Sequence, residues 1–169
     1  MIVLIFAKGK EQNMSDKLKI FLSGGMSNIS EEDSKKWRRL FKQVKYKNLS
    51  SCEYASSYTY FNPTTLYKPS EPYDPFYEAE AMNYDLYLVK HSDIIIVNFN
   101  SLSSIGTAQE VMLAYTLNKP IIGMIEDDKY DQLHPWYKEE CMKIFKYKPE
   151  ELEEIISKIT EYIWRFKYY

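Results

Sequence analysis

The chain has 169 residues and a formal net charge of −2, with 45% apolar and 27% charged residues. This balance suits one globular domain with a sizeable core and argues against disorder. Basic residues are interleaved with acidic ones, so nucleic-acid binding is not indicated, and no apolar run approaches membrane-spanning length.

The beginning of the chain reads as an N-terminal extension of uncertain role over residues 1–17, followed by a single domain over 18–169. The apolar stretch Met1 to Phe6 is too short for the core of a signal peptide, and no small-residue cleavage site follows it. Cys52 and Cys141 have no metal-ligand spacing. We therefore expect a reducing, cytoplasmic setting and no metal or other cofactor.

The first half of the domain predicts strand, glycine turn, helix and strand. Residues 18–22 are apolar and end at Ser23-Gly24-Gly25, as in a buried strand followed by a tight turn. A capping-box pattern at Ser30 then opens a helix, and the alternating segment 56–61 predicts a second strand. Four prolines within 63–76 favour a long loop over a helix.

The second half alternates in the same way. The expected elements are a helix over 78–90, a buried strand over 93–97, a helix over 108–117, a buried strand over 120–125, a charged loop through 131, a short edge strand over 142–145 and a helix from Pro149. Such alternation predicts an α/β fold, a flavodoxin-like doubly wound parallel sheet of order 2-1-3-4-5 with helices on both faces. Ligands of such sheets bind beyond the carboxyl ends of the strands, at the switch point.

Glu110 is the strongest candidate for chemistry, because it lies near the start of a helix that points at the switch point. The helix dipole and nearby backbone donors should keep its carboxylate ionised, as a nucleophile requires. Asp85 could face the same crevice and carry the proton. Taken on spacing alone, Glu110 equally suits a solvated helix charge and Asp85 a surface residue, while Asp93 borders a strand and suits a structural role.

Six short motifs in order resemble the nucleoside 2-deoxyribosyltransferase family. They are Ser23-Gly24-Gly25, Asn62-Pro63, Asp85 ahead of Ser92-Asp93, Gly106-Thr107 to Glu110, Ala114-Tyr115 and Lys119-Pro120, and together they span roughly residues 18–126. The resemblance implies an enzyme that cleaves the N-glycosidic bond of 2′-deoxynucleosides or their 5′-monophosphates. It implies that Glu110 forms a deoxyribosyl ester and that Asp85 orients and protonates the base.

The resemblance also implies the substrate-binding residues Phe21, Ser23, Gly24, Gly25, Asn62, Asn98, Ser104, Gly106 and Thr107. Two positions depart from the transferase pattern. Phe21 stands where many members have a tyrosine whose hydroxyl touches the nucleophile, and Ser104 stands where transferases often have an acid that holds the sugar 5′-hydroxyl. Both departures resemble the 5′-monophosphate N-hydrolase branch, so transfer to a second base and hydrolysis both stay open, beside a non-catalytic nucleotide-binding module.

The expected partners are a small deoxynucleoside or deoxynucleotide and further copies of the chain. By the resemblance, the segment His134 to Tyr137 reaches a neighbour's site in a homodimer or larger homo-oligomer, although it equally suits a loop packed on its own subunit. The tyrosine-rich segment 54–77 suits either stacking on a base or a strand and lid held by buried rings.

Overall fold

The computed structural model describes residues 17–26, 29–47, 58–65, 74–164 and 166. The predicted extension before residue 17, the strand residues 56–57 and residues 66–73 of the proline-rich segment lie outside them. Among the described residues, no helix is both long enough and apolar enough to cross a membrane.

A five-stranded sheet of order β2-β1-β3-β4-β5 forms the centre of the domain, and every neighbouring pair is parallel. This confirms the predicted fold class and strand order. The strands are β1 Leu18–Gly24, β2 Tyr58–Phe61, β3 Ile94–Asn98, β4 Ile121–Glu126 and β5 Lys143–Tyr147. The helices are α1 Glu31–Lys47, α2 Pro75–His91, α3 Ile105–Thr116, α4 Pro135–Glu140 and α5 Leu152–Trp164.

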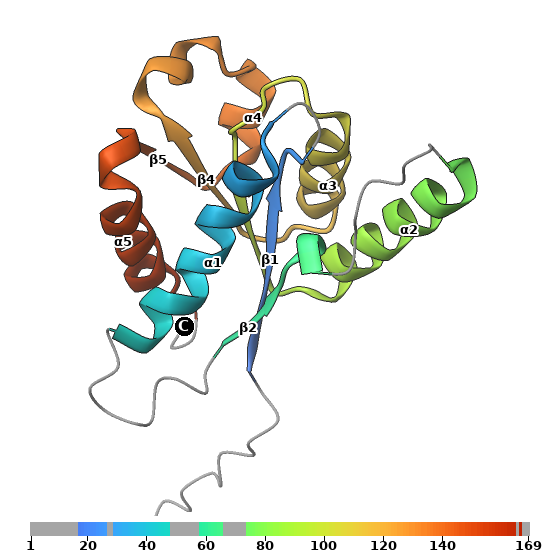
Figure 1. Cartoon of the computed structure of the whole chain (residues 1–169), viewed down its shortest axis with the longest axis horizontal. Coiled ribbons are helices and arrows are strands. Elements are labelled where there is room, and N and C mark those ends of the chain that lie inside the picture. The colour runs from blue at the N-terminus through green and yellow to red at the C-terminus, as the bar shows by residue number, and fades with distance from the viewer. Residues whose placement is uncertain (1–16, 27–28, 48–57, 66–73, 165, 167–169) are drawn as a thin grey trace, which may run out of the picture.

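Helices cover both faces of the sheet (Figure 1). Side chains alternate along each strand, so Ile20 and Leu22 of β1 join a core with α1 and α5, while Phe21 joins a core with α2 and α3. The same alternation sends Ser23 to the α2 and α3 face. Within each strand, odd-numbered and even-numbered residues therefore face opposite sides of the sheet.

Helix α3 begins at Ile105 rather than at 108, with Ser104 as its N-cap residue. Two further helix starts differ from the prediction, and proline explains both. Helix α2 begins at Pro75 rather than at 78, because the Asp74 carboxylate accepts hydrogen bonds from the backbone N–H groups of Phe76 and Tyr77. A proline at the first helical position lacks only an N–H that no helix bond would use. In the same way, His134 caps α4 and Pro135 opens it, within a segment that the sequence predicted to be a loop.

Other local predictions are confirmed. The backbone N–H of Asp33 donates to the Ser30 hydroxyl at the start of α1. Asp93 is structural, because its carboxylate accepts from the backbone N–H of Lys19 at 2.7 Å and its own N–H donates to the Lys19 carbonyl at 2.7 Å. These two bonds tie the beginning of β1 to the beginning of β3.

Candidate active site

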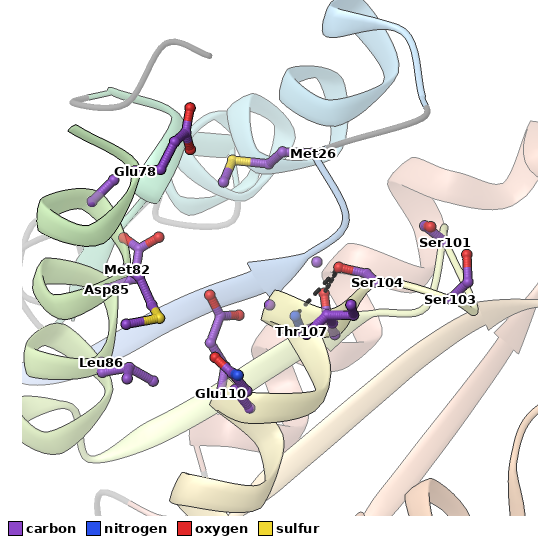
Figure 2. Close-up of a pocket in the computed structure, with 15 residues that line it drawn as sticks. Met26, Glu78, Met82, Asp85, Leu86, Ser101, Ser103, Ser104, Thr107 and Glu110 are labelled. Carbon is purple, nitrogen blue, oxygen red and sulfur yellow. Dashed lines mark hydrogen bonds between the residues drawn. The ribbon is translucent and has the colours of Figure 1, made fainter. Parts of the chain in front are cut away.

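A cavity of about 310 Å³ lies between α2 and α3 at the carboxyl end of β1. Its lining consists of Gly24, Met26, Glu78, Ala81, Met82, Asp85, Leu86, Ser101, Ser103, Ser104, Ile105, Gly106, Thr107, Gln109 and Glu110. Figure 2 shows Glu78 and Asp85 on α2, Glu110 on α3, and the serines toward the beginning of α3. The volume is at the lower end of the ~300–1,000 Å³ typical of small-molecule sites.

Glu110 stands on the second turn of α3, and its side chain reaches the end of β1. The Ser23 hydroxyl donates a hydrogen bond of 2.5 Å to Glu110 Oε2. This hydroxyl comes from the residue two positions after Phe21, on the same face of the strand. Phe21 has no hydroxyl with which to contact Glu110. Ser23 supplies the hydroxyl that does so.

Burial controls the ionisation of Glu110, whose side chain is only 7% exposed. Loss of solvent raises the pKa of Glu110 to about 8; the Ser23 hydrogen bond lowers it, the Asp85 charge raises it, and the Arg38 charge lowers it. Burial therefore opposes the helix dipole, which was expected to keep this carboxylate ionised at neutral pH. The reason is that Glu110 lies beneath the cavity and not on the solvated rim of the helix.

Asp85 extends from α2 into the same cavity (Figure 2). Burial raises its pKa to about 6, and the Arg38 charge opposes this shift. The structure thus brings the two predicted carboxyl groups into one cavity. Because Asp85 has the lower pKa of the two, it releases its proton first in the free protein.

The start of α3 forms the other end of the cavity. Ser104 is the N-cap residue, and its hydroxyl oxygen accepts from the Thr107 backbone N–H at 3.3 Å and from the Thr107 hydroxyl at 2.9 Å. Gly106 has no atom within 4 Å of the position where a side chain would begin. These three predicted residues lie together, with open space in front of Gly106.

Gly24 and Gly25 are required by the close approach of the loop after β1 to residues at and after the end of β3. A Cβ atom at Gly24 would lie 2.9 Å from the Asn98 carbonyl oxygen, and one at Gly25 would lie 2.6 Å from the Cβ of Ser101. The Asn100 side chain joins the same two loops, since its Oδ1 accepts from the Gly25 N–H at 3.0 Å. Gly24 lines the cavity, while Gly25 holds the loop after β1 against the loop after β3.

Five predicted substrate-binding residues do not line this cavity: Ser23 contacts it only through Glu110, and Gly25 contacts the loop after β3 instead. The other three lie elsewhere. Phe21 is fully buried in the core beneath α3. Asn62 closes a turn, with its Oδ1 accepting from the Thr64 N–H and hydroxyl. Asn98 lies on the α1 and α5 face, where it lines a second cavity with Trp37 and others; its parity with Ile94 and Ile96 on β3 already indicates that face.

Sequence reasoning missed Arg38. Its guanidinium is fully buried at the carboxyl end of β1, and its charge acts on both Glu110 and Asp85. The sequence does contain a signal for Arg38: it is a charged residue beside Trp37 in the helical stripe of apolar residues that continues to Phe41.

The segment His134 to Tyr137 is the cap and first turn of α4. Tyr137 packs on Phe99 of its own chain, with ring centroids 4.9 Å apart, whereas Trp136 is 66% exposed. Among the described residues, no group of three or more His, Cys, Asp or Glu side chains is placed to hold a metal ion.

Fold and cavity together define a class: a doubly wound parallel α/β protein with two carboxyl groups in a small-molecule cavity at the carboxyl edge of the sheet. No protein-family model matches the sequence, and no curated protein matches it. Solved structures do match.

A 2-deoxyribosyltransferase from Bacillus psychrosaccharolyticus is 18% identical, with a TM-score of 0.57 over 79% of this chain and 95% of that one. A CMP N-glycosidase from Clostridium botulinum is 16% identical, with a TM-score of 0.55 over 85% and 98% of the two chains. A conserved protein from Enterococcus faecalis V583 is 14% identical, with a TM-score of 0.56 over 82% and 97%. At these identities the likeness establishes a shared fold, and it agrees with the resemblance found in the sequence.

Proposed function

We propose that this protein cleaves the N-glycosidic bond of 2′-deoxynucleosides or their 5′-monophosphates and transfers the sugar to another base. One observation carries the proposal: the buried carboxyl group of Glu110 and the half-buried one of Asp85, from neighbouring helices, share one cavity at the carboxyl edge of the sheet. The fold shared with a 2-deoxyribosyltransferase and a CMP N-glycosidase supports the same chemistry.

In the proposed mechanism, the Glu110 carboxylate attacks the anomeric carbon while Asp85 gives a proton to the departing base. The bond from sugar to base breaks as the ester between sugar and Glu110 forms. A second base, deprotonated by Asp85, then attacks the ester and releases the carboxylate. Two carboxyl groups acting in this order are the usual means of glycosyl transfer with retention, and the ionised nucleophile also stabilises the oxocarbenium-like transition state.

This mechanism needs Glu110 ionised and Asp85 protonated, which is the reverse of their order in the free protein. Burial raises the pKa of Glu110 more than that of Asp85, so the form with Glu110 ionised and Asp85 protonated is the less populated of the two. The substrate therefore meets a small reactive fraction of the protein at neutral pH.

The test is incubation with a panel of deoxynucleosides and their 5′-monophosphates, each with its ribose counterpart, with and without a second base. We expect free base or a new nucleoside by chromatography, faster from deoxyribose than from ribose, because a 2′-hydroxyl withdraws electrons from the developing cation. Glu110→Ala should lower the rate by at least about a thousandfold. Glu150→Gln, at an exposed position near α5, serves as the control. Binding without turnover across the panel would leave a non-catalytic nucleotide-binding module.

Hydrolysis of deoxynucleoside 5′-monophosphates is the second candidate, and the serine-rich end of the cavity favours it. Ser101, Ser103 and Ser104 lie there beside the N-terminus of α3, which attracts anions. Against a phosphate stand three acids in the lining and no lysine or arginine.

Ser104→Asp separates the two candidates cleanly, because aspartate still caps the helix and adds only a negative charge. We expect the monophosphate to compete at least as well as its nucleoside for the wild-type protein and worse for Ser104→Asp. If Ser104→Asp leaves the preference between monophosphate and nucleoside unchanged, the result favours a transferase that acts on free nucleosides.

We also propose a homo-oligomer. Exposed apolar side chains gather on α2 and α3 around the cavity, where Met82 and Ile105 belong to both the lining and the exposed surface. A second copy on this surface would cover the open side of the site. Light scattering of the wild type beside Tyr115→Glu, on the same surface, tests it; a wild-type monomer would refute it.

A further inference from the structure

Arg38 of α1 holds the end of β1 whose Ser23 contacts Glu110, the proposed nucleophile. Its Nε donates to the Leu22 carbonyl at 3.2 Å, its Nη2 donates to the Gly24 carbonyl at 2.9 Å, and its Nη1 donates to the Ser34 carbonyl at 2.5 Å. Leu22 and Gly24 are the two neighbours of Ser23. The planar guanidinium therefore spans the residue whose hydroxyl holds Glu110.

The course of the sheet explains why an arginine is needed at this place. The Lys19 carbonyl accepts from Asp93 on the β3 side, and strand carbonyls alternate in direction. The carbonyls of Leu22 and Gly24 thus point to the β2 side. Strand β2 ends at Phe61, opposite Phe21, so these carbonyls lie beyond its last residue. Arg38 satisfies backbone acceptors that the edge strand does not reach.

Among the described residues, the hydrogen bonds that the Arg38 guanidinium donates go to backbone carbonyls and not to a carboxylate. The charged groups that act on it are Glu110 of α3 and Asp85 of α2. Burial lowers the pKa of Arg38 to about 10, so the guanidinium stays positive at neutral pH. Glu78 of α2 also lines the cavity.

We propose that Arg38 is a positioning residue for the reaction: its fork fixes Ser23 against Glu110, and its buried positive charge stabilises the carboxylates of Glu110 and Asp85. The inference rests on the proposed function for its place in catalysis, but its physical content is a property of the free protein. Two separate roles follow, one of geometry and one of charge.

Two substitutions separate these roles. Arg38→Met keeps the length of the side chain and removes both charge and donors. Arg38→Lys keeps the charge and removes the planar fork, since an ammonium group cannot span two carbonyls in the same way. Arg39→Met is the matched control, because Arg39 is the next residue on α1 and is partly exposed in an ion pair with Glu32.

The first measurement is the titration of the Asp and Glu carboxyl carbons by NMR in the free protein, which requires no substrate. We expect Arg38→Met to raise the apparent pKa values of the Glu110 and Asp85 pair by about one unit, and Arg38→Lys and Arg39→Met to leave them within about half a unit. A folded Arg38→Met protein with unchanged carboxyl titration overturns the charge role.

The second measurement is the pH profile of kcat/KM for release of the base. We expect Arg38→Met to move the rising limb of kcat/KM upward by the same unit, which is about a tenfold loss at pH 5 and about a twofold loss at pH 7. Arg38→Lys should lower kcat at every pH without moving the limbs, because only the position of Ser23 is lost. A normal kcat in Arg38→Lys overturns the geometric role, and this variant also decides the case if Arg38→Met does not fold. A shifted titration without base release from any compound would leave the inference standing and refute the proposed function.

Discussion

The two faces of the sheet are built differently. On one face, α1 and α5 bury regular apolar stripes against the strands, with Trp37, Phe41, Ile156 and Ile159 almost fully buried. On the other face, α2 and α3 bury fewer side chains and leave many large apolar ones exposed. Those exposed are Phe76, Tyr77, Met82, Tyr84, Tyr87, Ile105, Met112, Tyr115 and Leu117.

The two carboxyl groups of the proposed mechanism belong to the second face. Glu110 and Asp85 stand on α3 and α2, and the charge of Arg38 acts on them through the end of β1. Burying a carboxyl group costs stability unless it is compensated. The comparison teaches that the α1 and α5 face supplies stability, while the α2 and α3 face gives some of it up to hold the site.

The largest expected effects concern stability, and the first compares the two faces. Ile159→Ala, in the α1 and α5 core, should lower the free energy of unfolding by about 2 to 5 kcal/mol, because it leaves a cavity among packed side chains. Tyr115→Ala, on the exposed surface of α3, should change it by no more than about 0.5 kcal/mol. Urea denaturation measures both. Equal losses would mean that the two faces do not differ in this way.

Glu110→Gln should stabilise the fold at high pH. The folded pKa of about 8 lies above the usual 4.5, so the folded state keeps a proton that the unfolded chain has already released. Stability from this group is complete below pH 4.5 and is lost as pH rises to 8. The amide never ionises, so Glu110→Gln should gain about 5 kcal/mol above pH 8 relative to wild type, at about 1.4 kcal/mol for each unit of the pKa difference.

Thermal unfolding of Glu110→Gln and wild type at pH 4.5, 6.5 and 8.5 checks this, and the difference should grow with pH. A constant difference would show that Glu110 does not carry the pH dependence. Glu150→Gln, which is exposed, should show no such trend.

The pH dependence of kcat/KM should be bell-shaped. Its limbs belong to the coupled pair of Asp85 and Glu110, with apparent pKa values near 6 and 8 and a maximum near pH 7. Beyond each limb the rate should fall about tenfold per pH unit, equivalent to about 1.4 kcal/mol. A rate independent of pH between 5 and 9 would contradict the paired-carboxyl mechanism.

The smallest effect is expected at Gly106. Alanine there meets nothing within 4 Å and improves helix propensity, so Gly106→Ala should stabilise the protein by about 0.5 to 1 kcal/mol. Its methyl group faces the space where we expect the substrate, so KM should rise while the fold becomes more stable. Unchanged KM would mean that the substrate stays away from the start of α3.

Sequence by itself determined the strand order, the helix that carries Glu110 and the loop at Ser23 to Gly25, because period-2 and helical patterns and glycine turns are local signals. It also predicted Asp85 and Glu110 by resemblance. The starts of α2 and α4 were missed, although Asp74-Pro75 and His134-Pro135 are local capping signals of the same kind.

Tertiary structure alone decided how the site works. The burial of Glu110, and hence the rise of its pKa, depends on how closely α3 packs on the end of β1. The bond from Ser23 to Glu110 joins residues 87 positions apart in sequence. Arg38 acquires its role because β2 ends at Phe61, opposite Phe21, while the guanidinium contacts the carbonyls of Leu22 and Gly24 further along β1. No local sequence pattern sets the burial of Glu110, its bond to Ser23 or the contacts of Arg38. Each depends on which elements the folded sheet brings together.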